Sequence, residues 1–91
     1  MNEQLKEVLL ITQEECAEVI QAVSKIRRFG LVGQHPDKEY NNQEHLEEEL
    51  GDLCAMIDIL QELDIVSWAN IDKAAEAKRE KLKQWSNIFT D

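Results

Sequence analysis

Residues that interrupt regular secondary structure are concentrated in one short part of this 91-residue chain. Two of its three glycines and its single proline, Gly30, Gly33 and Pro36, fall within this part. On either side, apolar residues recur at helical spacing, and no stretch shows the alternation of apolar and polar residues that is typical of a strand. The sequence therefore predicts long helices separated by a connector of about 12 residues, and an all-α fold.

The first two helices can be bounded from their breakers and caps. Residues 2–29 contain neither Gly nor Pro and form one long helix. A second helix begins after Asn41, because Asn41 and Glu44 have the spacing of a reciprocal cap, and it continues to about Leu63. Gly51 is the one weak point within it.

A third helix completes the predicted bundle. Residues 64–69 form a turn, and Ser67 or Asn70 caps a helix that ends near Trp85. We expect a single domain over residues 1–91, because a chain of this length forms one core. Three helices with wide apolar faces exceed what one small subunit can cover. The bundle of long antiparallel helices is therefore expected to be completed by dimerisation, as a homodimer or a homotetramer built as a dimer of dimers.

Charge and composition exclude several classes of partner. The formal net charge is −9, from 19 acidic and 10 basic residues, and this field repels both nucleic acid and anionic lipid. No apolar run approaches the roughly 18 residues of a membrane span, and the first residues do not resemble a signal peptide. We expect a cytoplasmic protein that binds neither nucleic acid nor membrane, with Cys16 and Cys54 as reduced core residues.

Helical geometry places two carboxylates beside the apolar face of the first helix. Successive residues lie about 100° apart around a helix axis. The predicted core face follows Leu5: it comprises Leu9, Cys16, Ile20 and Val23, with Val8, Val19 and Ile26 adjoining it. Glu15 and Glu18 lie on one shoulder of this face, at about 280° and 220° from Leu5. Glu14 points away from it, at about 180°.

The second helix repeats this arrangement. Its predicted core face comprises Leu46, Leu50, Leu53, Ile57 and Leu60. Glu49 and Asp52 lie on the same shoulder, at about 300° and 240° from Leu46. His45 falls on this strip as well, and we expect it to be exposed in the first helical turn.

Two such helices packed together would bring both carboxylate pairs within reach of one another. Four carboxylates in a partly dry groove repel one another strongly unless cations lie between them. Oxygen-only ligand sets select hard cations, which favours Mg²⁺, with Mn²⁺ as a second choice. The alternative is a solvated acidic surface that pairs with lysines.

Lysines lie on and beside the apolar stripe of the third helix. The stripe contains Ile71, Ala74, Ala75, Leu82 and Trp85. Lys78 falls within it, and Lys81 flanks it. Either side chain can snorkel to water, or it can reach the acidic cluster or a phosphate held there.

These residues together resemble a known family. EECAE at 14–18 followed by EELGD at 48–52 is similar to the EExxE…ExxD signature of the MazG-like all-α nucleoside triphosphate pyrophosphohydrolases, and KREKL at 78–82 resembles their lysine-rich final helix. The resemblance covers residues 5–82 in the right order. It implies Mg²⁺-dependent cleavage of a nucleoside triphosphate between its α and β phosphates, giving a monophosphate and pyrophosphate. It also implies that Glu15, Glu18, Glu49 and Asp52 bind the metal in a helical oligomer.

The chemistry agrees with this resemblance. Metal ions neutralise phosphate oxygens, and a carboxylate left partly free can orient the attacking water. We assign this catalytic role to Glu15 or Glu18, and substrate binding to Lys78 or Lys81.

The chain departs from the family pattern in two places. Leu82 and Trp85 replace the usual KxxKN continuation, and the span between the acidic motifs is at the long end of the family's range. Three alternatives stay open: a dimeric dUTPase-like enzyme, a phosphoribosyl-ATP pyrophosphatase, and a non-enzymatic acidic helical adaptor. The phosphoribosyl-ATP pyrophosphatases usually have a lysine ahead of the acidic motif, where this chain has Ile11 and Thr12.

Overall fold

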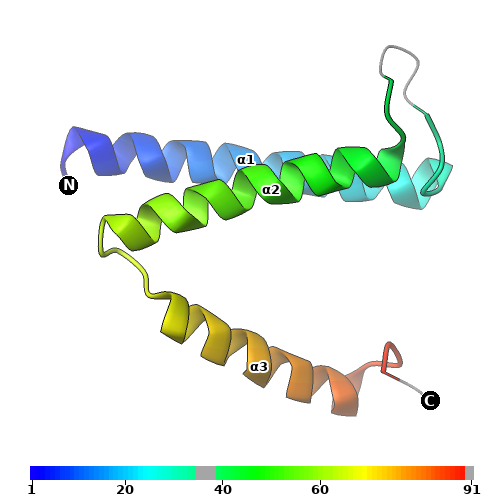
Figure 1. Cartoon of the computed structure of the whole chain (residues 1–91). Helices are drawn as coiled ribbons and strands as arrows, with labels where there is room; N and C mark the ends of the chain where they lie inside the picture. Colours follow the sequence, from blue (N-terminus) through cyan, green and yellow to red (C-terminus); the bar gives the residue numbers. More distant parts are fainter. Residues whose placement is uncertain (35–38, 90–91) are drawn as a thin grey trace. The chain divides into compact units, whose positions relative to one another are not determined.

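The structure, a computed structural model, describes residues 1–34 and 39–89 (Figure 1). It contains the helices α1 (Glu3–Phe29), α2 (Asn42–Glu62) and α3 (Trp68–Trp85), and no strand within the described residues. The predicted all-α class is therefore confirmed for this part of the chain. None of its helices has the length and apolar content needed to cross a membrane.

Side-chain caps set the starts of the first two helices. The Asn2 side chain accepts a hydrogen bond of 2.7 Å from the Leu5 amide at the start of α1. Asn41 Oδ1 accepts from the Glu44 amide at 2.8 Å, and Glu44 Oε1 accepts from the Asn41 amide at 3.1 Å. This reciprocal pair is the predicted capping box, and it fixes the first turn of α2.

The third helix begins at Trp68, within the turn predicted for residues 64–69. Ser67, one of the two expected caps, accepts from the Asn70 amide at 3.4 Å, so Trp68 and Ala69 are helical. The Trp68 amide also donates to Gln61 Oε1 at 2.8 Å. Asp64, in the turn that follows α2, has a φ of 60°.

The connector between α1 and α2 is held by backbone contacts. Gly30 ends α1 with a φ of 86°, a conformation that favours glycine. Asn42 is buried. Its side-chain Nδ2 donates to the Gly30 carbonyl at 3.0 Å, and its backbone N–H donates to the Gly33 carbonyl at 2.9 Å. A Cβ on Gly33 would lie 2.8 Å from both Asn42 Nδ2 and the Phe29 carbonyl oxygen. α2 therefore starts beside the end of α1 and returns alongside it (Figure 1).

The chain divides into two compact units, Met1–Ile59 and Leu60–Asp91. The first contains α1 and most of α2. The second contains α3, which has no buried residue; Ile71 and Leu82 are half-buried, and Trp85 is 83% exposed. The assignment of residues 1–91 to one domain stays a prediction.

The face of α1 that is least exposed differs from the predicted core face. Val8 and Ala22 are buried. Half-buried residues continue the same row with alternating spacings of three and four: Leu5, Thr12, Glu15, Val19 and Ile26. This row is centred at about 300° from Leu5, about 60° or more from the predicted centre.

Four of the residues predicted as core on α1 are therefore exposed in the chain. Leu9 is 38% exposed, Ile20 69% and Val23 41%, and the Cys16 thiol is also exposed. The apolar arc of α1 is wider than the strip that one helix can cover, so α2 covers only one side of it. The expectation that both cysteines are core residues was wrong, because Cys54 is exposed too.

The second helix shows part of the same shift. Asn42, Glu49 and Met56 are buried, although none of them was predicted as core. Of the predicted core face, Leu60 is buried and Leu46, Leu53 and Ile57 are half-buried. Leu50, predicted to be core, is 43% exposed. In both helices the shoulder that carries the carboxylates is thus part of the packed face.

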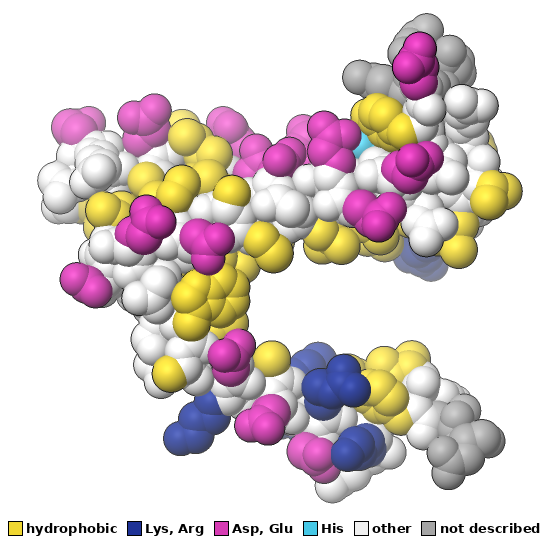
Figure 2. Space-filling view, viewed as in Figure 1, with side chains coloured by type: hydrophobic (Ala, Val, Ile, Leu, Met, Phe, Trp, Pro, Cys, Tyr) yellow, Lys and Arg dark blue, Asp and Glu magenta, His cyan; other side chains and the backbone are white. Residues whose placement is uncertain are grey.

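The α1–α2 hairpin consequently has two unlike sides. In Figure 2, acidic side chains run along one edge of the hairpin and hydrophobic side chains along the opposite edge. The acidic edge follows from the positions of Glu14, Glu18, Glu48 and Asp52 on the two helices, all of them exposed. Glu15 and Glu49 lie between the two edges, where the helices pack.

Candidate metal centre

Three carboxylates from two helices meet in the middle of the hairpin. Glu15 comes from the central turn of α1, and Glu49 and Asp52 come from one turn of α2. One oxygen from each of the three lies within 4.8 Å of the others. Glu49 is buried, Glu15 is half-buried and Asp52 is exposed. The group is therefore anchored in the helix interface at one end and open to solvent at the other.

Local electrostatics oppose this arrangement in the absence of a cation. The pKa of Glu15 is raised above its ordinary value, first because the helix interface partly desolvates the carboxyl group. The negative charges of Asp52, Glu49, Glu18 and Glu14 raise this pKa further, in that order of importance. Packing holds Glu15 among like charges, so a proton or a positive ion would relieve the repulsion.

The donor set fits a small hard cation. Mg²⁺ binds oxygen atoms at about 2.0–2.1 Å, which places ligand oxygens about 3–4 Å apart. Oxygens already within 4.8 Å of one another reach these separations through small side-chain rotations. All three donors are carboxylates. This type of ligand suits hard cations such as Mg²⁺ and Mn²⁺ and not softer metals. The solvent-exposed side at Asp52 leaves room for water or substrate oxygens.

The other predicted site residues lie outside this group. Glu18 is exposed, one turn beyond Glu15 on α1, and acts on the group through its charge. Glu14 is exposed, as predicted for a solvated residue. Lys78 and Lys81 are exposed on α3, and their substrate-binding role stays a prediction.

A histidine beside the group was not assigned a role from the sequence. His45 Nε2 lies 3.3 Å from Glu49 Oε1, and the two side chains are only 14% and 11% exposed. The expectation that His45 is exposed was wrong. The signal was present in the sequence, because residues four apart on a helix are neighbours and Glu49 lies four residues after His45.

Comparison with known proteins agrees with the acidic motifs. A family model described as the MazG nucleotide pyrophosphohydrolase domain matches residues 3–87. The chain belongs to this family. The matched range includes both helices that supply the carboxylates, so the three-carboxylate group is part of the MazG domain, whose members are typically metal-dependent. Searches of curated proteins and of solved structures gave no match.

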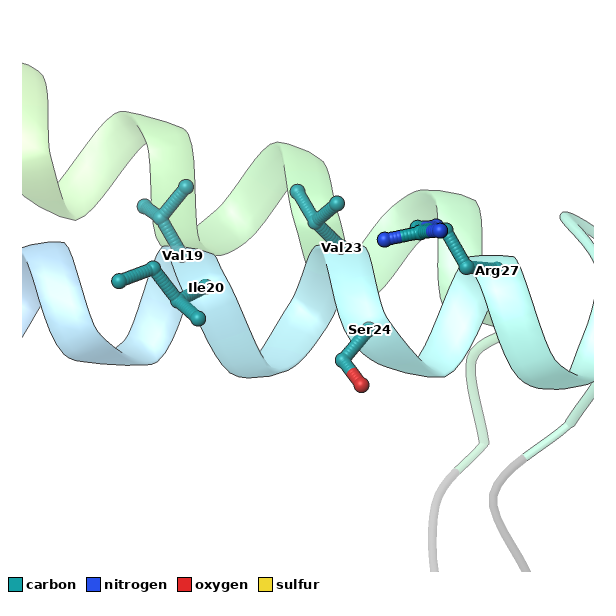
Figure 3. Close-up of a pocket in the computed structure, with 5 residues that line it drawn as sticks. All are labelled: Val19, Ile20, Val23, Ser24 and Arg27. Atoms are coloured by element: carbon teal, nitrogen blue, oxygen red, sulfur yellow. The ribbon is translucent and has the colours of Figure 1, made fainter.

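The MazG domain also has a shallow pocket whose lining contains no carboxylate. It is lined by Val19, Ile20, Val23, Ser24 and Arg27 of α1 (Figure 3). Three of these side chains are apolar, and Ile20 and Val23 belong to the exposed side of the helix. This surface differs in chemistry from the acidic edge.

Proposed function

We propose that this protein is a Mg²⁺-dependent nucleoside triphosphate pyrophosphohydrolase, with Mn²⁺ as an alternative ion. It cleaves a ribo- or deoxyribonucleoside triphosphate between the α and β phosphates and releases a monophosphate and pyrophosphate. The observation that carries this proposal is the three-carboxylate group inside a chain of the MazG family.

The carboxylates have two roles in this proposal, metal binding and water activation. Glu15, Glu49 and Asp52 hold the ion, and Glu18 completes the predicted set. When bound, the ion neutralises charge on the phosphate oxygens. Glu15 or Glu18 orients a water molecule and accepts its proton as the water oxygen bonds to the α phosphorus. The bond from that phosphorus to the α–β bridging oxygen then breaks, and the pyrophosphate leaves with the electron pair. The exposure of Glu18, outside the group of three, supports its assignment as this base.

The proposal is tested by measuring products across a panel of substrates. Purified protein is incubated with canonical and modified nucleoside triphosphates, with Mg²⁺, with Mn²⁺ and with a chelator. We expect equimolar monophosphate and pyrophosphate, and none with the chelator. Activity confined to dUTP, or to phosphoribosyl-ATP, would assign the protein to one of the related pyrophosphatases. Release of inorganic phosphate in place of pyrophosphate, or no hydrolysis of any substrate, would contradict the proposal, and the second result favours an adaptor.

In the same assay, Lys78 and Lys81 are proposed to contact substrate phosphates. Both are exposed lysines in an acidic protein, and a mobile ammonium group suits phosphate oxygens. Lys78→Met and Lys81→Met keep the apolar stem of the side chain and remove its charge. We expect at least one of them to lower kcat/KM about tenfold, which is 1.4 kcal/mol of lost transition-state binding, with the melting temperature unchanged. Unaltered kinetics in both variants would leave the lysines as surface residues.

We further propose that the exposed apolar side of α1 packs against a second copy of the chain. Leu9, Cys16, Ile20 and Val23 continue along α1 with the spacing of a helix-packing seam. An apolar strip of this length on a small acidic protein is best covered by an identical strip, because self-association repeats the apolar contact and keeps the acidic edges free. This completes an antiparallel helical bundle as a dimer, or as a dimer of dimers.

Charge introduced into this seam should separate the subunits. We expect light scattering at micromolar concentration to give at least twice the chain mass of 10.6 kDa for the wild type. Ile20→Glu should reduce the mass to that of one chain, because a dimer would bury the new carboxylate at the interface. Leu10→Glu is the matched control, since Leu10 is 56% exposed but lies about 140° from Leu5, away from the seam. A fully active wild-type monomer would contradict the proposal.

A further inference from the structure

We propose that His45 is a positioning residue that holds the Glu49 carboxylate in the orientation required for metal binding. The inference rests on the proposed metal-dependent function. It assigns a role to a side chain that is neither a predicted ligand nor a predicted base.

The contact lies in a protected place. His45 Nε2 faces Glu49 Oε1 at 3.3 Å, and both side chains are largely removed from solvent. A carboxylate has two oxygens, so one can face the imidazole while the other faces a cation. Since both residues are on α2, four positions apart, the contact is built into the helix and does not depend on a loop.

The His45 ring has a second neighbour, and the backbone of His45 is fixed in a capped turn. The Tyr40 ring lies against it with the ring centroids 5.6 Å apart and the planes inclined by 31°. The His45 amide donates to the Asn41 carbonyl at 3.0 Å, in the turn that the Asn41–Glu44 capping box fixes. The fixed backbone and the Tyr40 ring both limit how the imidazole can turn away from Glu49.

Such a support matters because the carboxylates repel one another. Without a partner on its far oxygen, Glu49 can lower the repulsion by rotating away from Glu15 and Asp52. A nitrogen–hydrogen group facing Oε1 opposes this rotation and lowers the entropy lost when the ion binds. Hydrogen-bonding partners of metal ligands change metal affinity by about 10- to 100-fold when they are removed.

His45 acts through Glu49 and not as a ligand. The three residues whose donor atoms lie within 4.8 Å of one another are all carboxylates, and His45 is not among them. Its printed contact with the group is to Glu49 Oε1, at 3.3 Å from Nε2.

The experiment compares two amide substitutions of different length. Gln at position 45 keeps an N–H donor that reaches Glu49, whereas Asn is one methylene shorter and does not. Titration calorimetry with Mn²⁺ alone should show affinity reduced about 10- to 100-fold in His45→Asn and in His45→Phe, and near the wild-type value in His45→Gln. His45→Phe keeps an aromatic ring for Tyr40 to contact, and circular dichroism verifies that each variant is helical. At saturating Mn²⁺, kcat should recover in all three.

Equal Mn²⁺ affinity in wild type, His45→Asn and His45→Phe would overturn the inference. Pulsed electron paramagnetic resonance of the Mn²⁺ complex should show no directly bound imidazole nitrogen, and such a signal would make His45 a ligand and overturn the positioning role. His45-dependent Mn²⁺ binding without pyrophosphate release would overturn the proposed function and leave this inference intact. Wild-type protein that binds no Mn²⁺ would overturn both.

Discussion

Glu49→Gln should abolish Mg²⁺-dependent pyrophosphate release and leave a folded, helical protein. Glu49 is the buried member of the three-carboxylate group, so Gln occupies the same space on the packed face of α2. It removes a negative charge and a strong oxygen ligand, and the metal contributes several kcal/mol to stabilising the transition state. We expect a loss of about 100- to 1000-fold or more in kcat/KM. Initial rates of pyrophosphate release over a range of Mg²⁺ concentrations measure it.

The other two carboxylates should behave in the same way. Glu15→Gln and Asp52→Asn remove the remaining oxygens of the group, whereas Glu14→Gln removes an equal charge from an exposed neighbour of Glu15. Glu14→Gln should retain wild-type rates, and damage as large as that of Glu49→Gln would contradict the metal site. Glu18→Gln separates the two roles proposed for Glu18. If Glu18 is a base and not a ligand, its loss lowers kcat without weakening Mg²⁺ binding.

The helix boundaries were predictable because short-range chemistry determines them. The Asn41–Glu44 pair satisfies amides that are three residues apart, and Ser67 does the same for Asn70. Such contacts depend only on local sequence. The same holds for Gly30, whose positive φ ends α1 where the sequence places its first glycine.

Which part of each helix would be packed was less predictable. Apolar residues occupy a wide arc of α1, and periodicity alone does not say which part of the arc its neighbouring helix covers. The neighbour covers the strip that contains Thr12, Glu15 and Ala22, and leaves Ile20 and Val23 exposed. The packed strip contains a carboxylate and a hydroxyl, so it is less apolar than the exposed strip that contains Ile20 and Val23. The hydrophobic pattern therefore favoured the exposed strip.

The proximity of Glu15 to Glu49 could be predicted because it did not depend on that choice. Glu15 and Glu49 lie on corresponding sides of their helices, so any hairpin that packs these sides brings them together. Their burial was underestimated, because the shoulder proved to be the centre of the interface. The burial of His45 was missed for the same reason: a residue in a first helical turn is exposed unless its side faces the neighbouring helix.

Mg²⁺ should raise the melting temperature of the wild-type protein, and mild acid should raise that of the metal-free protein. An ion that binds only the folded state stabilises it by about 2.7 kcal/mol at 100 times its dissociation constant. For a chain of this size that corresponds to a rise of about 15 °C. Glu15→Gln should lose this rise, whereas Glu14→Gln should keep it. Thermal melts with Mg²⁺ and with a chelator measure both.

The pH dependence without metal follows from the raised pKa of Glu15. In the unfolded chain this carboxyl group has its ordinary pKa, so the folded state binds the proton more tightly. The stabilisation is therefore fully present below the ordinary pKa and is lost as the pH rises through the higher pKa of the folded state. Protons and Mg²⁺ compete for the same oxygens, so the rise in melting temperature with Mg²⁺ should shrink as the pH falls.

Glu15→Gln isolates this contribution from that of the other carboxyl groups. A neutral amide at position 15 removes the repulsion from Asp52 and Glu49, so the metal-free variant should melt at a higher temperature than wild type near neutral pH. Its advantage should decline as the pH is lowered from neutrality through the raised pKa of Glu15, because the wild-type carboxyl becomes protonated there. Melting curves for wild type, Glu15→Gln and Glu14→Gln over this range, in chelator, make the comparison. A Glu15→Gln variant that is less stable than wild type at neutral pH would show that the carboxylate is held by attractive contacts, and the repulsion on which the metal site is argued would then be absent.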